Sequence, residues 1–142
     1  MQAQGSSARL AIALEDTFKT RPSLTLHDCE AAWDELVDAD ATVTADASVF
    51  KVGTKSMKAV VAAGLGAGDI VATDNFAAKD LSGYTYIGLW LRSSVALDAG
   101  DYQLLLDDTA QCASPLETLN FPAVPAAQVD TWIFAKLALS TP

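Results

Sequence analysis

The sequence is poor in the residues that most often carry catalytic chemistry. It holds a single histidine, His27, among 142 residues. One histidine supplies too few ligands for a zinc site, and a Ser–His–Asp triad needs partners that are not evident near it. We therefore expect His27 to be a strand residue with a hydrogen-bonded ring, and we expect no enzyme activity.

Cysteine is also scarce, with only Cys29 and Cys112. Two cysteines exclude a scaffold built on several disulfides. Two interpretations stay open for this pair: one bridge between them, or two buried free thiols. The free thiols are favoured for a protein made in the cytoplasm.

Long apolar runs and basic residues are lacking as well. No run approaches the roughly 20 apolar residues that cross a bilayer, and the opening MQAQGSSARLAIALED shows no secretory signal. The chain has 9 Lys and Arg against 18 Asp and Glu, for a net charge of −9. Proteins that bind phosphate backbones usually have the opposite balance, so we expect neither a membrane nor a nucleic-acid partner. The acidic excess suits solubility or a basic protein surface.

Hydrophobic residues, by contrast, are plentiful at 51%, and the length suits one domain with a core. The strongest pattern lies in residues 80–107, where two apolar runs flank a turn at residues 98–101. Residues 84–91 are aromatic, β-branched or Leu, which predicts a central strand covered on both faces. Residues 102–106 are predicted to be its antiparallel neighbour.

The rest of the domain alternates short strands with turns. Further strands are predicted at residues 24–30, 42–45, 57–63, 69–76, 116–121 and 131–139. Residues 57–63 are rich in alanine and leave helix open, although Gly53 and Gly64 bound a helix of typical length too tightly. Residues 64–68 form a glycine-rich mobile loop and not a dinucleotide fingerprint, because no helical pattern follows. About eight short strands predict an all-β, antiparallel sandwich or barrel.

Residues 1–23 differ from the domain at residues 24–142 and are predicted to be an N-terminal arm. Residues 9–14 favour either a short strand or a helical turn, and the segment returns to charge before Pro22. Two interpretations are open, a frayed terminus or an extended arm that binds a partner. In the second, the interaction residues are Arg9, Leu10, Ile12, Leu14 and Phe18.

Several short motifs, taken in order, carry a family resemblance. They are Asp28 and Glu30 ahead of Trp33; Lys51-x-Gly53-x-x-Ser56-Met57-Lys58; Asp80-Leu81-Ser82-x-Tyr84-x-x-Ile87-x-Leu89-Trp90-Leu91-Arg92-Ser93-Ser94; and Thr131-Trp132. Their order and spacing resemble the carbohydrate-binding-module-like jelly rolls, especially those of tailed-phage structural proteins. The resemblance spans residues 24–139 and implies a jelly-roll β-sandwich of about eight strands.

The first 22 residues carry a second resemblance. Gln4-Gly5-Ser6-Ser7-Ala8-Arg9-Leu10, Glu15-Asp16-Thr17-Phe18 and Pro22 resemble the opening of many phage tail and tail-tube proteins. The jelly rolls differ in one respect: they usually continue beyond the Thr-Trp strand into a strand with an acidic Asp-Asp-hydrophobic motif. We therefore expect either a truncated chain that lacks its last strand or a neighbouring subunit that completes the sheet.

The same resemblance implies a candidate calcium site. In sugar-binding members, early acidic residues and the Asp of the last strand commonly hold a structural Ca²⁺. Here Asp28 and Glu30 are the candidate ligands, but the closing Asp is absent and Ca²⁺ takes 6–8 oxygens. The alternative is that both are polar residues at a strand end, so no cofactor is expected beyond this calcium.

Aromatic residues and one acidic pair are the remaining candidates. Trp33, Tyr84, Tyr86 and Tyr102 are candidates for stacking on a sugar or on another subunit, although strand packing is the favoured role. Trp90 and Trp132 lie within strong strand patterns and are expected in the core. Asp107 and Asp108 resemble a paired-carboxylate site, but neighbouring strand residues point to opposite faces, so we expect a solvated strand end.

Together these features favour a phage virion structural protein, most of all a capsid decoration (cement) protein that binds the lattice of the major capsid protein. We expect a homo-oligomer located in the virion, in which an arm adds a strand to a neighbour's open edge. A tail-tube or other tail structural protein is the second hypothesis. A carbohydrate-binding module with a glycan ligand is the third.

Overall fold

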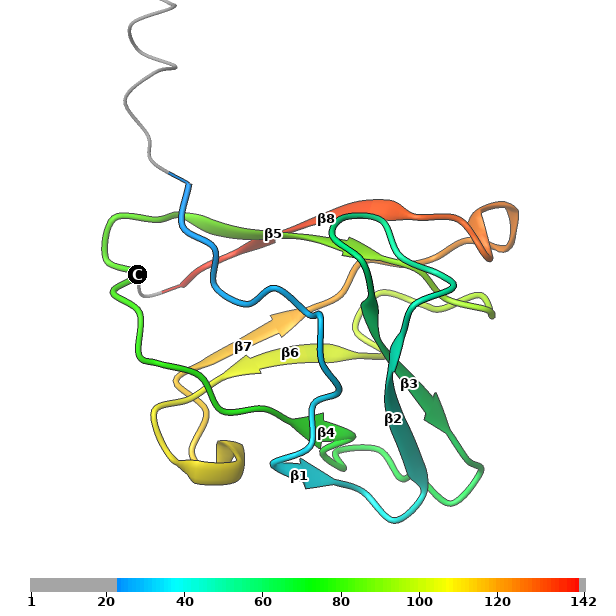
Figure 1. Cartoon of the computed structure of the whole chain (residues 1–142), viewed down its shortest axis with the longest axis horizontal. Helices are drawn as coiled ribbons and strands as arrows, with labels where there is room; N and C mark the ends of the chain where they lie inside the picture. Colours follow the sequence, from blue (N-terminus) through cyan, green and yellow to red (C-terminus); the bar gives the residue numbers. More distant parts are fainter. Residues whose placement is uncertain (1–22, 141–142) are drawn as a thin grey trace, which may run out of the picture.

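The computed structural model describes residues 23–140, which contain eight short β-strands and no α-helix (Figure 1). The strands are β1 (Leu36–Val37), β2 (Ala41–Asp46), β3 (Ser56–Val61), β4 (Ala72–Thr73), β5 (Tyr86–Leu91), β6 (Gln103–Leu106), β7 (Glu117–Asn120) and β8 (Ile133–Ala138). Two single 3₁₀ turns, η1 (Ala110–Cys112) and η2 (Ala126–Gln128), lie in the connections. No helix among these residues is long and apolar enough to span a bilayer.

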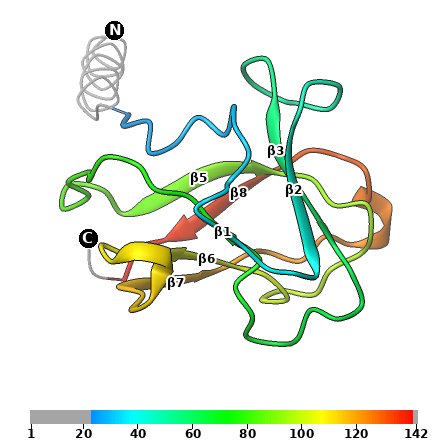
Figure 2. The ribbon, with the colours of Figure 1, turned by 60° about the horizontal axis from the view of Figure 1, so that its bottom comes forward.

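The strands form four separate antiparallel ladders, β1–β4, β2–β3, β5–β8 and β6–β7. The β5–β8 ladder lies beside β6–β7, and the β2–β3 hairpin lies at the side away from the C-terminus (Figures 1 and 2). The expectation of an antiparallel all-β protein of about eight strands is confirmed. The ladders are small and unclosed, and they do not merge into the two large sheets that define a jelly roll.

The predicted central pair is wrong in its partners. Residues 84–91 do form a strand, β5, but it pairs with β8 through Leu89↔Ala135. Residues 102–106 supply β6, which pairs with β7 through Leu104↔Leu119. The expectation that β5 is covered on both faces is also wrong, because its residues alternate between exposed and half-buried. A two-stranded ladder with one face on a core leaves the other face in solvent.

Two other predicted strands are absent or shorter. Residues 24–30 form no strand, because Cys29 takes a left-handed backbone (φ 57°) and its N–H bonds to the His27 ring. Residues 69–76 contribute only the two-residue β4. Residues 57–63, for which helix was left open, form β3. The predicted strands at 42–45, 116–121 and 131–139 are confirmed as β2, β7 and β8.

The core lies where the β5–β8 and β6–β7 ladders meet. Leu119, Ala135 and Leu137 are buried there. Half-buried side chains pack around them from all four strands and their ends: Ile87, Leu89, Leu104, Phe121 and Leu139. Because side chains alternate along a strand, burial of Ala135 and Leu137 turns Phe134 and Lys136 outward. The core therefore fixes which face of β5–β8 meets solvent.

Candidate binding surface

The solvent side of the β5–β8 ladder presents three large aromatic rings. Tyr86 is 43% exposed, Trp90 is 41% exposed and Phe134 is 55% exposed. They alternate with the half-buried Ile87 and Leu89, which face the core. The β5–β8 ladder therefore gathers three exposed rings on its solvent side.

The backbone register explains why two of these rings touch. The N–H of Leu139 donates to the carbonyl of Thr85 (3.1 Å), which makes this pair hydrogen-bonded. Hydrogen-bonded and non-hydrogen-bonded pairs alternate along an antiparallel ladder, so Trp90↔Phe134 is a non-hydrogen-bonded pair. Side chains lie closer in such pairs. The rings of Trp90 and Phe134 accordingly meet edge to face, with centroids 5.3 Å apart and an interplanar angle of 65°.

Gly88 makes room for this arrangement. It lies between Tyr86 and Trp90 on the exposed side of β5. A Cβ atom at this position would approach Cζ of Phe134 to 2.6 Å, so any other residue would displace the ring. Glycine therefore leaves room for the Phe134 ring over β5.

Two lysines bring positive charge to the same surface. Nζ of Lys51 lies 4.6 Å from the ring centroid of Trp90, and Nζ of Lys136 lies 3.9 Å from that of Tyr86. Both distances are typical of cation–π contacts. We call Tyr86, Gly88, Trp90, Phe134, Lys136 and Lys51 the aromatic face. Its two ammonium groups stand out because residues 23–140 hold 6 Lys and Arg against 16 Asp and Glu.

Lys51 reaches the aromatic face from the β2–β3 connection, residues 47–55, which acidic side chains hold at both ends. At one end Asp46 Oδ1 accepts hydrogen bonds from the backbone of Ser48 (2.7 Å) and Val49 (3.2 Å). The hydrogen bond from the Ser48 side chain has the largest effect on the pKa of Asp46, and the one from the Ser48 backbone has the next largest. Together they lower this pKa to about 2. At the other end the backbone N–H and hydroxyl of Thr54 donate to Glu30 (2.8 and 2.6 Å) and lower the pKa of this carboxyl.

The contacts of Glu30 bear on the calcium implied by the resemblance. Both of its carboxylate oxygens serve Thr54, and Asp28 Oδ1 accepts the backbone N–H of Glu30 (3.1 Å). Residues 23–140 contain no group of three or more His, Cys, Asp and Glu side chains that converge as metal ligands. Ca²⁺ takes 6–8 oxygens. In the described residues Asp28 and Glu30 use these oxygens to shape a loop, and the calcium site stays a prediction.

The predicted stacking residues are separated by the structure. Tyr86 lies on the aromatic face, whereas Trp33, Tyr84 and Tyr102 are half-buried elsewhere. The placement of Trp90 in the core is wrong, since it lies on the exposed side of β5, and Trp132 is half-buried. The predicted arm residues Arg9, Leu10, Ile12, Leu14 and Phe18 lie outside the described residues.

His27 is a structural residue in this arrangement. Its Nδ1 accepts the N–H of Cys29 (2.9 Å), so Nε2 carries the proton and donates to Asp74 (2.8 Å). The rings of Trp33 and Phe76 pack against it, with centroids 5.8 and 5.6 Å away. The expectation of a hydrogen-bonded ring is confirmed, but the expectation that His27 lies in a strand is wrong. With both nitrogens engaged, His27 cannot deprotonate the neighbouring thiol.

Both cysteines are free thiols, and each is half-buried. Burial raises the pKa of Cys29, and the carboxylates of Asp28, Asp74 and Glu30 raise it further. Burial likewise raises the pKa of Cys112, together with Asp107 and Glu35. Because the thiolate is the reactive form, neither environment suits a nucleophile.

Asp107 and Asp108 do not form a paired-carboxylate site. Asp107 accepts hydrogen bonds from the N–H and hydroxyl of Thr109 (3.1 and 2.6 Å) and from the N–H of Ser114 (2.7 Å). Partial burial acts to raise its pKa, but these bonds outweigh that effect and lower it. Asp107 thus closes the loop around η1, while Asp108 is exposed.

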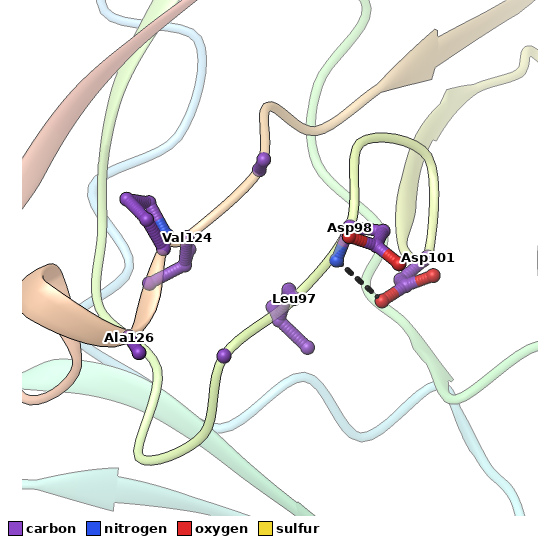
Figure 3. Close-up of a pocket in the computed structure, with 8 residues that line it drawn as sticks. Leu97, Asp98, Asp101, Val124 and Ala126 are labelled. Atoms are coloured by element: carbon purple, nitrogen blue, oxygen red, sulfur yellow. Dashed lines mark hydrogen bonds between the residues drawn. The ribbon is translucent and has the colours of Figure 1, made fainter.

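An open hollow of about 410 Å³ lies between the residue 96–101 segment and the residue 123–126 segment (Figure 3). Leu97 and Val124 join these segments through an isolated β-bridge, and Val124 is fully buried. Asp101 faces Asp98 in the hollow, but its Oδ2 accepts the backbone N–H of Asp98 (2.7 Å) and so serves the turn. Its lining combines apolar side chains, among them Leu97 and Val124, with the carboxylates of Asp98 and Asp101.

Sequence reasoning missed most of the aromatic face, namely Trp90, Phe134, Lys51 and Lys136. The information was present as alternation. Tyr86, Gly88 and Trp90 share one side of a strand opposite Ile87 and Leu89, and Phe134 and Lys136 do the same opposite Ala135 and Leu137. What the sequence did not provide was the pairing of β5 with β8, which sets the two exposed sides next to each other.

No protein-family model, curated protein or solved structure matches this chain. The comparisons therefore assign neither a family nor an activity. A function follows only from the aromatic face, the ladders that support it and the sequence motifs.

Proposed function

We propose that this chain is a non-enzymatic structural protein of a bacteriophage virion, a capsid decoration protein that binds the assembled shell of major capsid protein. In this proposal the four ladders belong to a jelly-roll-like sandwich, and the aromatic face is the surface that contacts the shell. The observation that carries the proposal is this face, with three rings between 41% and 55% exposed on one ladder. The resemblance of the sequence motifs to those of phage structural proteins is the reason for proposing a phage virion as the particle.

The chemistry of the aromatic face suits a protein contact. Tyr, Trp and Phe are enriched in the buried centres of protein–protein interfaces, where they account for much of the binding energy. Lys51 and Lys136 lie over the rings of Trp90 and Tyr86, where they would meet carboxylates of a partner. Binding that requires the assembled lattice stabilises that lattice by mass action. A decoration protein needs no further chemistry.

A position in the tail is the second candidate. It rests on the resemblance of residues 4–22 to the opening of phage tail and tail-tube proteins. The aromatic face would then contact another tail subunit in place of the capsid lattice. Locating the protein on particles separates the two positions.

Carbohydrate binding is the third candidate, and the exposed rings of Tyr86 and Trp90 are the observation in its favour. Sugars stack on flat, accessible ring faces. Here an ammonium group lies over one face of each of these rings, and Phe134 is inclined by 65° to Trp90. The geometry therefore favours a protein partner over a stacked sugar.

The test uses particles of the phage that encodes the chain. The double variant Trp90→Ala/Phe134→Ala removes two exposed rings and leaves the core residues untouched. If each ring contributes about 2 kcal/mol to binding, the double variant should raise the dissociation constant for particles, measured by co-sedimentation, by several hundredfold or more. The control is Val95→Ala/Leu116→Ala, which truncates two exposed apolar residues outside the aromatic face.

Three results would decide the matter. Particle binding by the native chain, with loss only in the aromatic variant, supports the proposal. Equal loss in both double variants would mean that the aromatic face is not the contact. If the native chain does not sediment with particles and binds a glycan array in a way that depends on Trp90, the sugar-binding function replaces the proposal.

A further inference from the structure

We infer that the outer edge of β3 accepts residues 9–14 of a second copy of this chain as an added strand. The inference deepens the proposed assembly role and rests on it. It names the acceptor edge, the donor segment and the partner, which is another copy of the same protein.

The ladder register shows which backbone groups of β3 are open. The N–H of Ala62 donates to the carbonyl of Asp40 (2.7 Å), which makes this pair hydrogen-bonded. Bonded pairs alternate along the β2–β3 ladder, so Val60↔Thr42 and Lys58↔Thr44 are bonded. The N–H and C=O groups of Met57, Ala59 and Val61 therefore point away from β2. No other strand within residues 23–140 pairs with this edge.

The open edge is also exposed and apolar. The four residues from Lys58 to Val61 are all exposed, and Val60 is 54% exposed, whereas β2 is largely half-buried. Natural edge strands are usually protected by proline, a bulge or an inward charge. The register of β3 is continuous, with no bulge and no proline, and Lys58 lies 3.6 Å from Asp46 on β2. This edge is therefore a template for an added strand.

Residues 9–14, Arg-Leu-Ala-Ile-Ala-Leu, match this edge in length and pattern. They number six, as β3 does, and Leu10, Ile12 and Leu14 fall on one side of an extended chain. The charge is complementary as well. Residues 1–22 hold three basic side chains against two acidic ones, whereas residues 23–140 hold 6 against 16. The eight residues between Leu14 and Ser23 span up to about 27 Å, which suits exchange between adjacent copies.

The decisive variant is Ala59→Pro. Ala59 sits in a non-hydrogen-bonded pair with Val43, so proline removes an outward N–H and leaves the β2–β3 bonds in place. The matched control is Ala63→Pro. The N–H of Leu65 donates to the carbonyl of Ala62 (3.3 Å), which closes a four-residue turn. Ala63 is the second residue of this turn, a position that favours proline.

The donor side is tested by Ile12→Asp in the full chain. We measure self-association of purified protein by analytical ultracentrifugation across a concentration series. Ala59→Pro and Ile12→Asp should each raise the dissociation constant by at least about tenfold, equivalent to about 1.4 kcal/mol. Ala63→Pro should not change it. A mixture of the Ala59→Pro and Ile12→Asp chains should associate again, because one supplies an intact arm and the other an intact edge.

Several outcomes would overturn the inference. A native chain that stays monomeric means that no second copy is bound. Native-like association of Ile12→Asp would mean that β3 pairs with something other than residues 9–14. If Ala59→Pro and Ala63→Pro weaken self-association equally, the open edge of β3 is not the binding site. If Ala59→Pro fails to fold, Ile12→Asp still decides, because Ile12 lies outside residues 23–140, which contain all eight strands. None of these experiments includes particles, so their failure is distinct from failure of the decoration role.

Discussion

The substitution Gly53→Ala tests how the β2–β3 connection, and with it Lys51 of the aromatic face, is held in place. Gly53 adopts φ +76°, a left-handed conformation that favours glycine. A Cβ atom at this position would overlap Oε1 of Glu30, whose carboxylate accepts both hydrogen bonds from Thr54. Alanine therefore imposes two separate penalties, one on the backbone and one on the Glu30–Thr54 contact.

Two other glycines separate these penalties. Gly68 also has a positive φ of +94°, but a Cβ there would meet nothing within 4 Å. Gly68→Ala should therefore lower the free energy of unfolding by about 1–2 kcal/mol, the backbone cost alone. Gly83 has an equally open surrounding and no left-handed φ, so Gly83→Ala should stabilise slightly, by about 0.4–1 kcal/mol. Gly53→Ala should destabilise more than Gly68→Ala, because it also displaces Glu30.

The additional destabilisation by Gly53→Ala, beyond that by Gly68→Ala, should decrease as the pH is lowered. The hydrogen bonds from Thr54 lower the pKa of Glu30 below its ordinary value of 4.5. A lowered folded pKa gives stability that is present above the ordinary value and is lost as pH falls through the folded value. The difference between Gly53→Ala and Gly68→Ala should therefore be full at neutral pH and shrink in acid.

Urea denaturation of the three variants at neutral and acidic pH measures these differences, and an NMR titration follows the carboxyl of Glu30 directly. The pKa of Glu30 should rise in Gly53→Ala and stay unchanged in Gly68→Ala. Equal destabilisation by both variants, or an excess that does not change with pH, would refute the role of the Glu30–Thr54 contact.

Three further predictions concern single side chains. Leu137→Ala should lower the free energy of unfolding by about 2–4 kcal/mol in urea titrations, because Leu137 is buried in the core. Ser48→Ala should raise the pKa of Asp46 from about 2 part of the way to its ordinary 3.8 in an NMR titration, because it removes the Ser48 hydroxyl, whose hydrogen bond lowers this pKa most, and leaves the backbone N–H in place. His27→Ala should speed amide exchange in residues 23–35, because it removes the contact with Asp74.

Each of these has a result that would count against it. A loss below about 0.5 kcal/mol for Leu137→Ala, the size expected of exposed Leu116→Ala, would place the core elsewhere. An unchanged pKa of Asp46 would mean that other groups hold its charge. Faster exchange throughout β7 and β8, and not in residues 23–35 alone, would show that His27 supports the whole fold.

The class of fold was predictable from local sequence because strand formation depends on local composition. Residues 116–121 and 131–139 alternate or are rich in large apolar residues, and both became strands. The pairing was not predictable. The assumption that consecutive strands pair fails for β5, whose partner β8 begins 42 residues after β5 ends, because the closer run, β6, pairs with β7 instead.

Residues 24–30 show a second limit of local pattern. They alternate as a strand should, yet their backbone donors bond to side chains two residues back, as in Cys29 to His27 and Glu30 to Asp28. Asx-type contacts of this kind compete with a ladder for the same N–H groups. Periodicity alone cannot tell which of the two an Asp or His will choose. The aromatic face was missed for a different reason, because its assembly depends on the long-range pairing of β5 with β8.

The separation of the strands into four two-stranded ladders links the aromatic face to the edge of β3. Two strands leave an unpaired edge on each side, and a single hairpin is marginal without further packing. Within residues 23–140 only four hydrophobic residues are buried, Leu119, Val124, Ala135 and Leu137. Large rings and valines remain on the surface instead. Under the proposed function, a partner on the aromatic face and an added strand on β3 would cover apolar groups that the core of residues 23–140 leaves exposed.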